Sequence, residues 1–193
     1  MARTTPVQVA LRLLDRGMAH PVADGENGHA LQNQSGAVDT AGNAILRAND
    51  ARAAFGVTGA GVPIGVISGG IDHLAASIAT GDVPPQVTVL RQGSGDEGTA
   101  MLEIVHDLAP GAPLLFFGTM GLPQATSLEM GAGINALAAA GARVIVDDFV
   151  FFDQPKFEDG PIAQAARAFA TGGRVYVTSA NNFALTHYVS IGI

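Results

Sequence analysis

Short, continuously apolar runs alternate along most of the chain with longer segments in which apolar residues recur every three or four positions. The short runs predict strands that are buried on both faces. They occupy residues 62–68, 87–90, 114–117, 144–147 and 174–179. The longer segments predict helices, and they occupy residues 44–55, 97–108, 123–140 and 161–170. Strands that alternate with helices of this length indicate βαβ units and a parallel sheet.

We therefore expect an α/β domain of three layers, with a mostly parallel sheet and helices on both faces. In such sheets, binding and catalytic groups gather at the carboxyl ends of the strands, where loops lead into helices. Three loops of this kind carry polar residues, and they begin near Ser68, Leu90 and Ser179. Function must be argued from these loops, because the alternation of strands and helices fits many different folds.

The first 40 residues do not share this pattern. Residues 17–40 are rich in Gly, Asn, Gln, Asp and His, which predicts a loose segment, and residues 5–16 suit one short helix. The expected organisation is a loose segment over residues 1–40 and an α/β domain over residues 41–193. No secretory signal is visible, because Gln8 and Arg12 interrupt the apolar stretch near the N-terminus. The compartment in which the protein works stays open.

Composition narrows the classes of partner. The chain has 193 residues, of which 48% are hydrophobic and 14% charged, as in a compact domain. The net charge is −7 and the ten basic residues are scattered, so we expect no nucleic-acid partner. No apolar run reaches the ~18 residues of a membrane helix, so we expect no membrane partner. Cysteine is absent, and no motif indicates a metal or a cofactor.

Residues 96–112 carry the most informative motif. They read Asp-Glu-Gly-Thr at the start of a predicted helix and Ala-Pro-Gly-Ala at its end. This pattern resembles the catalytic helix of the subtilisin/sedolisin class of serine peptidases. Subtilisins have a histidine before Gly-Thr, where this chain has Glu97, and sedolisins use a glutamate before such a helix as general base. The resemblance implies that Glu97 is a general base. The alternative is an acidic residue that only satisfies free amides at a helix N-terminus.

The rest of this helix predicts how Glu97 is surrounded. Sedolisins place an aspartate one turn after the glutamate, but Met101 stands there, so this helix supplies no second carboxylate to tune Glu97. Helical spacing predicts a buried face made of Ala100, Met101, Ile104, Val105 and Leu108. It predicts a solvated face made of Glu103, His106 and Asp107.

The loop after the first strand reads Ser68-Gly69-Gly70-Ile71-Asp72. Subtilisins have their catalytic aspartate where Ser68 stands, and an aspartate is not needed when there is no histidine to orient. The two glycines also resemble part of a phosphate-binding loop, but the complete spacing of such loops is missing. A tight turn is therefore favoured over nucleotide binding, and Asp72 is expected to cap the next helix.

Two further positions follow from the resemblance. Asn182 takes the place of the asparagine that donates to the oxyanion in subtilisins, although an Asn-Asn turn is the simpler alternative. Residues Asp148, Phe149 and Val150 stand where subtilisins pair with an extended peptide substrate by β-augmentation. Phe149 is equally well suited to the hydrophobic core.

The nucleophile of this class has no counterpart in the sequence. These peptidases carry their serine in Gly-Thr-Ser, after the oxyanion asparagine, and no Gly-Thr-Ser occurs in the 193 residues. Ala125-Thr126-Ser127 precedes the Asn182 strand, and Ser68 and Ser179 have no histidine partner. We expect a serine-peptidase-like domain over residues 41–185, whose intact relatives cleave peptide or protein substrates, and we expect this chain alone to be inactive.

Three other hypotheses remain. The first is a pseudoenzyme that binds extended peptides along residues 148–150. The second is the N-terminal part of a longer enzyme, in which case apolar surface at the edge of the sheet predicts self-association. The third is a doubly wound α/β domain that binds a small molecule, and the loops disfavour it because they lack a phosphate-binding pattern.

Overall fold

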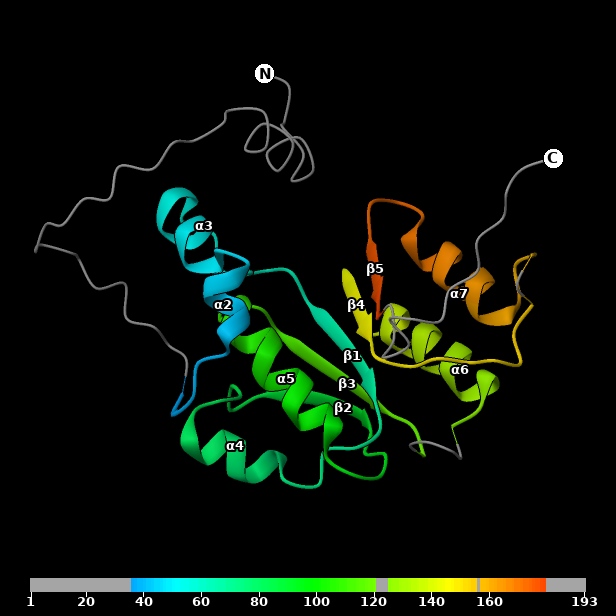
Figure 1. The fold of residues 1–193 in the computed structure, drawn as a ribbon, viewed down its shortest axis with the longest axis horizontal. Coiled ribbons are helices and arrows are strands. Elements are labelled where there is room, and N and C mark those ends of the chain that lie inside the picture. The colour runs from blue at the N-terminus through cyan, green and yellow to red at the C-terminus, as the bar shows by residue number, and fades with distance from the viewer. Residues whose placement is uncertain (1–35, 121–124, 156, 180–193) are drawn as a thin grey trace, which may run out of the picture. The chain divides into compact units, whose positions relative to one another are not determined.

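The computed structural model describes residues 36–120, 125–155 and 157–179. Five strands form one sheet in the order β2-β3-β1-β4-β5, and every neighbouring pair is parallel (Figure 1). The strands are β1 (Ile64–Ser68), β2 (Val87–Arg91), β3 (Leu114–Gly118), β4 (Val144–Asp147) and β5 (Val175–Thr178). The prediction of an α/β fold with a parallel sheet is confirmed.

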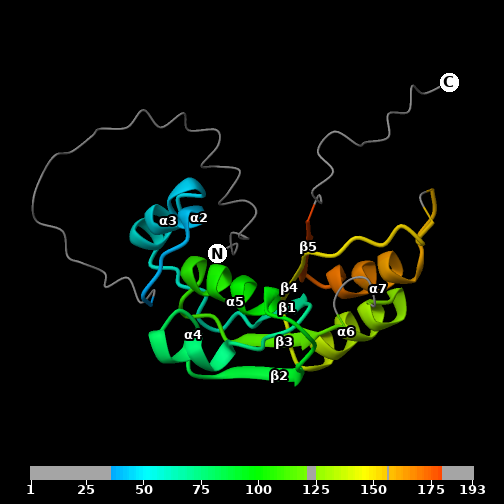
Figure 2. The ribbon, with the colours of Figure 1, turned by 60° about the horizontal axis from the view of Figure 1, so that its bottom comes forward.

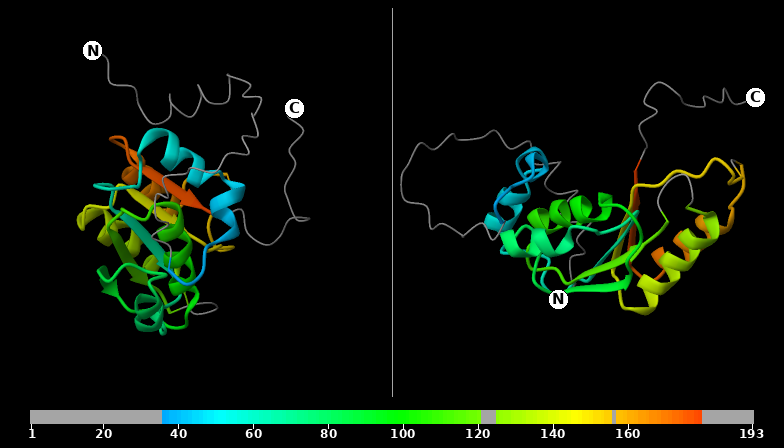
Figure 3. Two further views of the ribbon diagram at one scale, coloured as in Figure 1. Left: turned by 90° about the vertical axis from the view of Figure 1, so that its left-hand side faces the viewer. Right: turned by 90° about the horizontal axis from the view of Figure 1, so that it is seen from below.

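Helices cover both faces of this sheet, as Figure 2 shows. On one face lie α4 (Leu74–Thr80) and α5 (Glu97–Leu108), and on the other lie α6 (Ser127–Ala139) and α7 (Pro161–Ala170). Two shorter helices, α2 (Ala41–Ile45) and α3 (Ala48–Phe55), precede β1. Helix α2 lies beside α5 (Figure 3). None of the helices in the described part of the chain is long and apolar enough to cross a membrane.

Each face of the sheet has its own hydrophobic core. The core under α4 and α5 is formed by Val66, Ile71, Val83, Leu102, Ala112, Leu114 and Phe116. The core under α6 and α7 is formed by Ile67, Leu115, Phe117, Met130, Ile134, Leu137, Ala142, Ile145, Phe149 and Phe169. Successive residues of β1 and β3 enter opposite cores because side chains alternate across a strand. Full burial of each large side chain contributes roughly 1.5–3 kcal/mol.

The sequence predicted several bounds correctly, and local signals explain the others. Helix α6 begins at Ser127, later than the predicted residue 123, because Thr126 and Glu129 form a capping box that fixes its start. Residues 44–55 form two helices where one was expected. Arg47 between them adopts a left-handed conformation with φ of 57°, which interrupts the helical backbone.

The predicted faces of α5 require a correction. His106 and Asp107 are each only 5% exposed, whereas Ile104, expected to be buried, is 45% exposed. The buried stripe of the helix runs through Gly98, Leu102 and His106. It is displaced from the expected face, and Ala100 is exposed as well, because the helix is covered by more than the sheet.

The additional cover of α5 comes from the segment before β1. The backbone N–H of Thr40 donates to Oδ2 of Asp107 at 2.6 Å. The Arg52 guanidinium donates to the carbonyl oxygens of Asp107 and Leu108 at 3.0 and 2.8 Å, and so satisfies the last turn of α5. Val38 is held in the same region by a hydrogen bond from its N–H to Oδ1 of Asp82 at 2.8 Å.

Candidate functional site

Two neighbouring strands bring a serine and an aspartate together at the carboxyl edge of the sheet. In the register of β1 with β4, Ile67 pairs with Asp147, so Ser68 and Asp148 leave the sheet side by side. The hydroxyl of Ser68 donates to Oδ2 of Asp148 at 3.3 Å. Ser68 is fully buried and Asp148 is half-buried. The carboxyl group therefore lies at the boundary between the core and solvent.

A glycine contact places the start of α5 over the same edge. The N–H of Gly98 donates to the carbonyl oxygen of Gly70 at 2.9 Å. A Cβ on Gly98 would lie 2.5 Å from the ring of Phe116 and 2.6 Å from that carbonyl oxygen. No larger residue fits between the helix and the β1 loop without displacing one of them. Glu97, one residue earlier, is held beside the ends of β1 and β4.

The loop after β2 is locked to the same place. The N–H of Ser94 donates to the carbonyl oxygen of Gly69 at 3.1 Å. Gly93 has φ of 75°, and a Cβ there would lie 1.9 Å from the Gly69 oxygen. Gly118, at the end of β3, approaches Gly93 so closely that a Cβ would lie 2.4 Å from its Cα. Three loops at the carboxyl edge are thus interlocked through backbone contacts that require glycine.

Glu97 and Asp148 form a pair of interacting carboxyl groups at this edge. The pKa of Asp148 is raised to about 6, first by burial, then by the negative charge of Glu97 and by a hydrogen bond between the two side chains. The hydrogen bonds that Asp148 accepts from its own backbone and from Ser68 lower this pKa. The two side chains are thus close enough for the charge of one to raise the pKa of the other. The carboxyl group that lies beside Glu97 is thus supplied by the residue after β4.

Asp147 fixes the backbone from which Asp148 extends. It is buried, and its Oδ1 accepts hydrogen bonds from the N–H of Phe149 at 3.1 Å and the hydroxyl of Thr178 at 3.0 Å. Burial raises the pKa of Asp147, while hydrogen bonds from Tyr176, Phe149 and Thr178 oppose that rise. Asp147 and Asp148 contact different neighbouring elements. Asp147 ties β4 to β5, and Asp148 faces β1 and α5.

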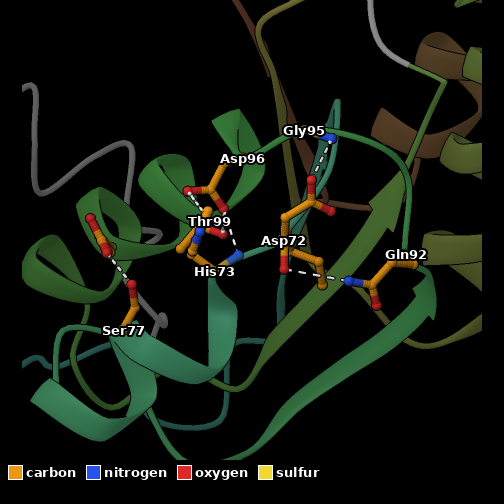
Figure 4. A network of polar contacts seen from close by, with 9 residues as sticks. Asp72, His73, Ser77, Gln92, Gly95, Asp96 and Thr99 are labelled. Carbon is orange, nitrogen blue, oxygen red and sulfur yellow. Dashed lines mark hydrogen bonds and ion pairs between the residues drawn. The ribbon is translucent and has the colours of Figure 1, made fainter.

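A second polar network lies beside the pair, at the entry to α5 (Figure 4). Asp96 accepts from the N–H of His73 at 2.8 Å and from the hydroxyl of Thr99 at 2.7 Å, while Nδ1 of His73 lies 3.1 Å from its other oxygen. The hydrogen bond from Thr99, followed by that from the His73 backbone, lowers the pKa of Asp96. These bonds connect the N-terminus of α4 to the N-terminus of α5.

The expected role of Asp72 was wrong. Helix α4 begins after His73, which makes no side-chain cap, and Asp72 does not bind the first turn. Its Oδ2 instead accepts from the N–H of Gly95 at 3.2 Å, and its own N–H donates to the Gly95 carbonyl at 3.1 Å. Asp72 therefore joins the β1 loop to the loop before α5.

The structure brings some of the predicted site residues together and not others. Glu97 and Asp148 meet, and Val150 is half-buried nearby in the chain. Phe149 packs in the core under α6 and α7, with its ring centroid 5.9 Å from that of Phe151, so its side chain occupies the core position that the sequence also allowed. Asn182 lies outside the described residues. Within the described ranges, no group of three or more acidic or histidine side chains could hold a metal ion.

The arrangement can transfer protons at one exposed point. Glu97 is exposed to solvent while its partner is half-buried, so the pair can exchange a proton with a bound molecule. A carboxyl pair whose protonated member has a pKa near 6 is suited to general acid–base chemistry close to neutral pH. Ser68 has no exposed surface and cannot attack a substrate. Its hydroxyl acts as a donor within the site.

Comparisons with known proteins give matches by structure only. No family model matches the sequence, and no curated protein matches it. The prenylagaramide maturation protease PagA is similar at 17% identity and a TM-score of 0.46, over 61% of this chain and 44% of that protein. The self-cleaved protease domain of PatA is similar at 18% and 0.45, over 63% and 50%. A lanthipeptide protease is similar at 16% and 0.43, over 63% and 37%. The chain spans half or less of each of these proteins.

Proposed function

We propose that this chain carries the acid–base part of a serine-peptidase-like site, with Glu97 as general base and Asp148 as its carboxyl partner. The observation that carries the proposal is the contact between these two side chains at the carboxyl edge of the sheet. The Gly-Thr and Ala-Pro-Gly-Ala pattern around α5 supports it, because that pattern resembles the catalytic helix of the subtilisin/sedolisin class. The resemblance alone left a simple helix-terminus role for Glu97 open. The presence of a second carboxyl group beside Glu97 favours the catalytic role for this residue.

In an intact enzyme of this kind, the reaction is hydrolysis of a peptide bond through an acyl-enzyme. Ionised Glu97 accepts the proton of a serine hydroxyl as that oxygen bonds to the substrate carbonyl carbon. Glu97 then returns the proton to the leaving amine as the carbon–nitrogen bond breaks. Asp148 is the carboxyl partner of Glu97, and its own pKa is raised to about 6 by burial and by the charge of Glu97. Asn182 donates to the oxyanion, a contribution of about 3 kcal/mol to transition-state stabilisation in a complete site.

The substrate in this proposal is an extended peptide that lies along residues 148–150. Backbone hydrogen bonds to such a segment give affinity that does not depend strongly on sequence. Because Phe149 points into the core, selectivity comes from side chains other than its ring. The base at Glu97 and the peptide-binding segment are adjacent, since Asp148 belongs to both.

We further propose that these 193 residues bind peptides without cleaving them. Among the described serines, Ser68 is the one that contacts the carboxyl pair, and it is buried. A base without an accessible nucleophile cannot form an acyl-enzyme. In this proposal, these residues on their own bind peptides as a pseudoenzyme does.

Two measurements test this proposal. The purified chain is treated with a serine-directed phosphonate fluoride at acidic and neutral pH, with an active subtilisin as positive control; we expect no labelled serine. Binding of unstructured peptides is followed by NMR, and we expect shifts at residues 147–150. E97Q should alter the pH dependence of binding, and the matched control E103Q should not, because Glu103 instead accepts a hydrogen bond from Ser77. Stoichiometric labelling, or peptide binding elsewhere on the surface, would contradict the proposal.

A further inference from the structure

We infer that Ser68 is a positioning residue of the carboxyl pair: its hydroxyl holds Oδ2 of Asp148 and so fixes the orientation of this carboxyl group beside Glu97. The inference rests on the proposed function, since it concerns the same site. It assigns to Ser68 a task that differs from that of the aspartate found at this position in subtilisins.

The backbone holds Ser68 where this contact is possible. The carbonyl oxygen of Ser68 accepts from the N–H of Thr119 at 2.9 Å, which ties the end of β1 to the segment after β3. On its other side, β1 is paired with β4 up to Ile67 and Asp147. Ser68 has no exposed surface, so its hydroxyl cannot turn outward to bind water. A hydrogen bond to Asp148 satisfies a donor that would otherwise be costly to bury.

The two oxygens of Asp148 have different surroundings. Oδ2 accepts the Ser68 hydroxyl at 3.3 Å. Oδ1 is buried and receives no hydrogen bond from a donor of another residue in the described part of the chain. The Ser68 hydroxyl therefore holds one oxygen of Asp148 and leaves the other without such a donor.

Other charged groups nearby are engaged elsewhere. The carboxylate of Asp96, at the entry of α5, is bound to His73 and Thr99. The carboxyl group of Asp147, on β4, is bound to Thr178 and the Phe149 backbone. The groups that face Asp148 are Glu97 from α5, Ser68 from β1 and its own backbone. Among the described side chains that act on Asp148, Ser68 is thus the one that stabilises its charged form.

Removal of the Ser68 hydroxyl should make Asp148 easier to protonate. A hydrogen bond to the charged form of a carboxyl group lowers its pKa, so loss of the bond raises it. In the full chain, carboxyl carbon NMR of S68A should show the Asp148 titration midpoint about one unit above that of the wild type. The control S77A also loses a buried hydroxyl that donates to a carboxylate, that of Glu103. S77A should leave the Asp148 midpoint unchanged.

A second variant keeps the test decisive if S68A does not fold. S68C retains nearly the same volume but has a weaker donor, and it should raise the midpoint by a smaller amount than S68A. An unchanged midpoint in a folded S68A or S68C protein would overturn the inference. Loss of peptide binding with a normal titration would instead count against the proposed function, because the carboxyl pair would then be intact.

Discussion

The N–H of Gly98 donates to the carbonyl oxygen of Gly70 at 2.9 Å, and this single backbone contact joins the start of α5 to the loop after β1. The contact is possible because Gly98 has no Cβ, which would lie 2.6 Å from the Gly70 oxygen. It fixes the backbone next to Glu97, the residue that acts on Asp148. The geometry of the carboxyl pair thus depends on a residue that has no side chain.

Substitution of this glycine should be destabilising. In G98A the new methyl group would lie 2.5 Å from the Phe116 ring and 2.6 Å from the Gly70 oxygen. We expect a loss of about 1–3 kcal/mol in the free energy of unfolding, measured by urea denaturation. The matched control is G131A in α6, where a Cβ meets nothing within 4 Å. That control should be stabilised by about 0.5–1 kcal/mol through helix propensity. Equal effects in the two variants would show that Gly98 is not tightly packed.

The carboxyl pair should also affect stability as a function of pH. The pKa of Asp148 is raised from 3.8 to about 6 in the folded protein, so the folded state holds this proton more tightly than the unfolded state. Its contribution is therefore fully present below pH 3.8 and is lost as the pH rises to about 6. D148N should remove this loss and stabilise the protein above pH 6 by at most about 3 kcal/mol, reduced by solvent screening.

This second prediction is measured as the difference in melting temperature between D148N and the wild type across that pH range. The control is D153N, which neutralises an exposed carboxylate a few residues away. A melting-temperature difference that does not change with pH, or that appears equally in D153N, would contradict the prediction. It would show that the charge on Asp148 does not destabilise the folded protein near neutral pH.

The segment before α2 should be released when Asp82 is neutralised. The pKa of Asp82 is lowered first by the hydrogen bond from Thr80 and then by the N–H of Val38. The ionised form therefore stabilises this attachment at neutral pH, and the attachment weakens as the pH falls through the lowered pKa. In D82N, hydrogen exchange at the Val38 amide should become faster. D50N, which breaks an exposed ion pair with Arg47, should leave this amide unchanged, and equal protection in D82N would refute the attachment.

The sequence predicted the bounds of a helix or strand correctly where a local signal marks its start or end. The bounds of α5, α7 and β4 agree with the prediction, because Ala-Pro-Gly-Ala follows α5, Pro161 begins α7 and β4 is a short apolar run. Helix α4 was not delimited in advance. Its sequence, LAASIAT, is short and made largely of small residues, so its periodicity is weak, and it is ended by a left-handed Gly81 rather than by a proline.

The site was only partly predictable because its contacts join distant parts of the chain. Met101 indicated that α5 places no carboxylate one turn after Glu97. The carboxyl group beside Glu97 follows β4 instead, and no spacing along the sequence reveals that two such distant residues meet. Asp107 was assigned to a solvated face because the backbone of Thr40, which covers it, comes from a segment that looked loose. The Asp147-Asp148 pair after a buried strand was the available signal. It pointed to the carboxyl edge without showing which aspartate faces Glu97.

The most direct test of this account is the titration of Asp148 in the presence and absence of the Glu97 charge. Carboxyl carbon NMR of the full chain should give an Asp148 midpoint near the value of about 6 in the wild type. In E97Q the midpoint should fall, because the negative charge is removed and the glutamine amide can donate to an ionised Asp148. E103Q should titrate as the wild type does. An Asp148 midpoint that is the same in E97Q and the wild type would contradict the claim that these two residues form an interacting pair.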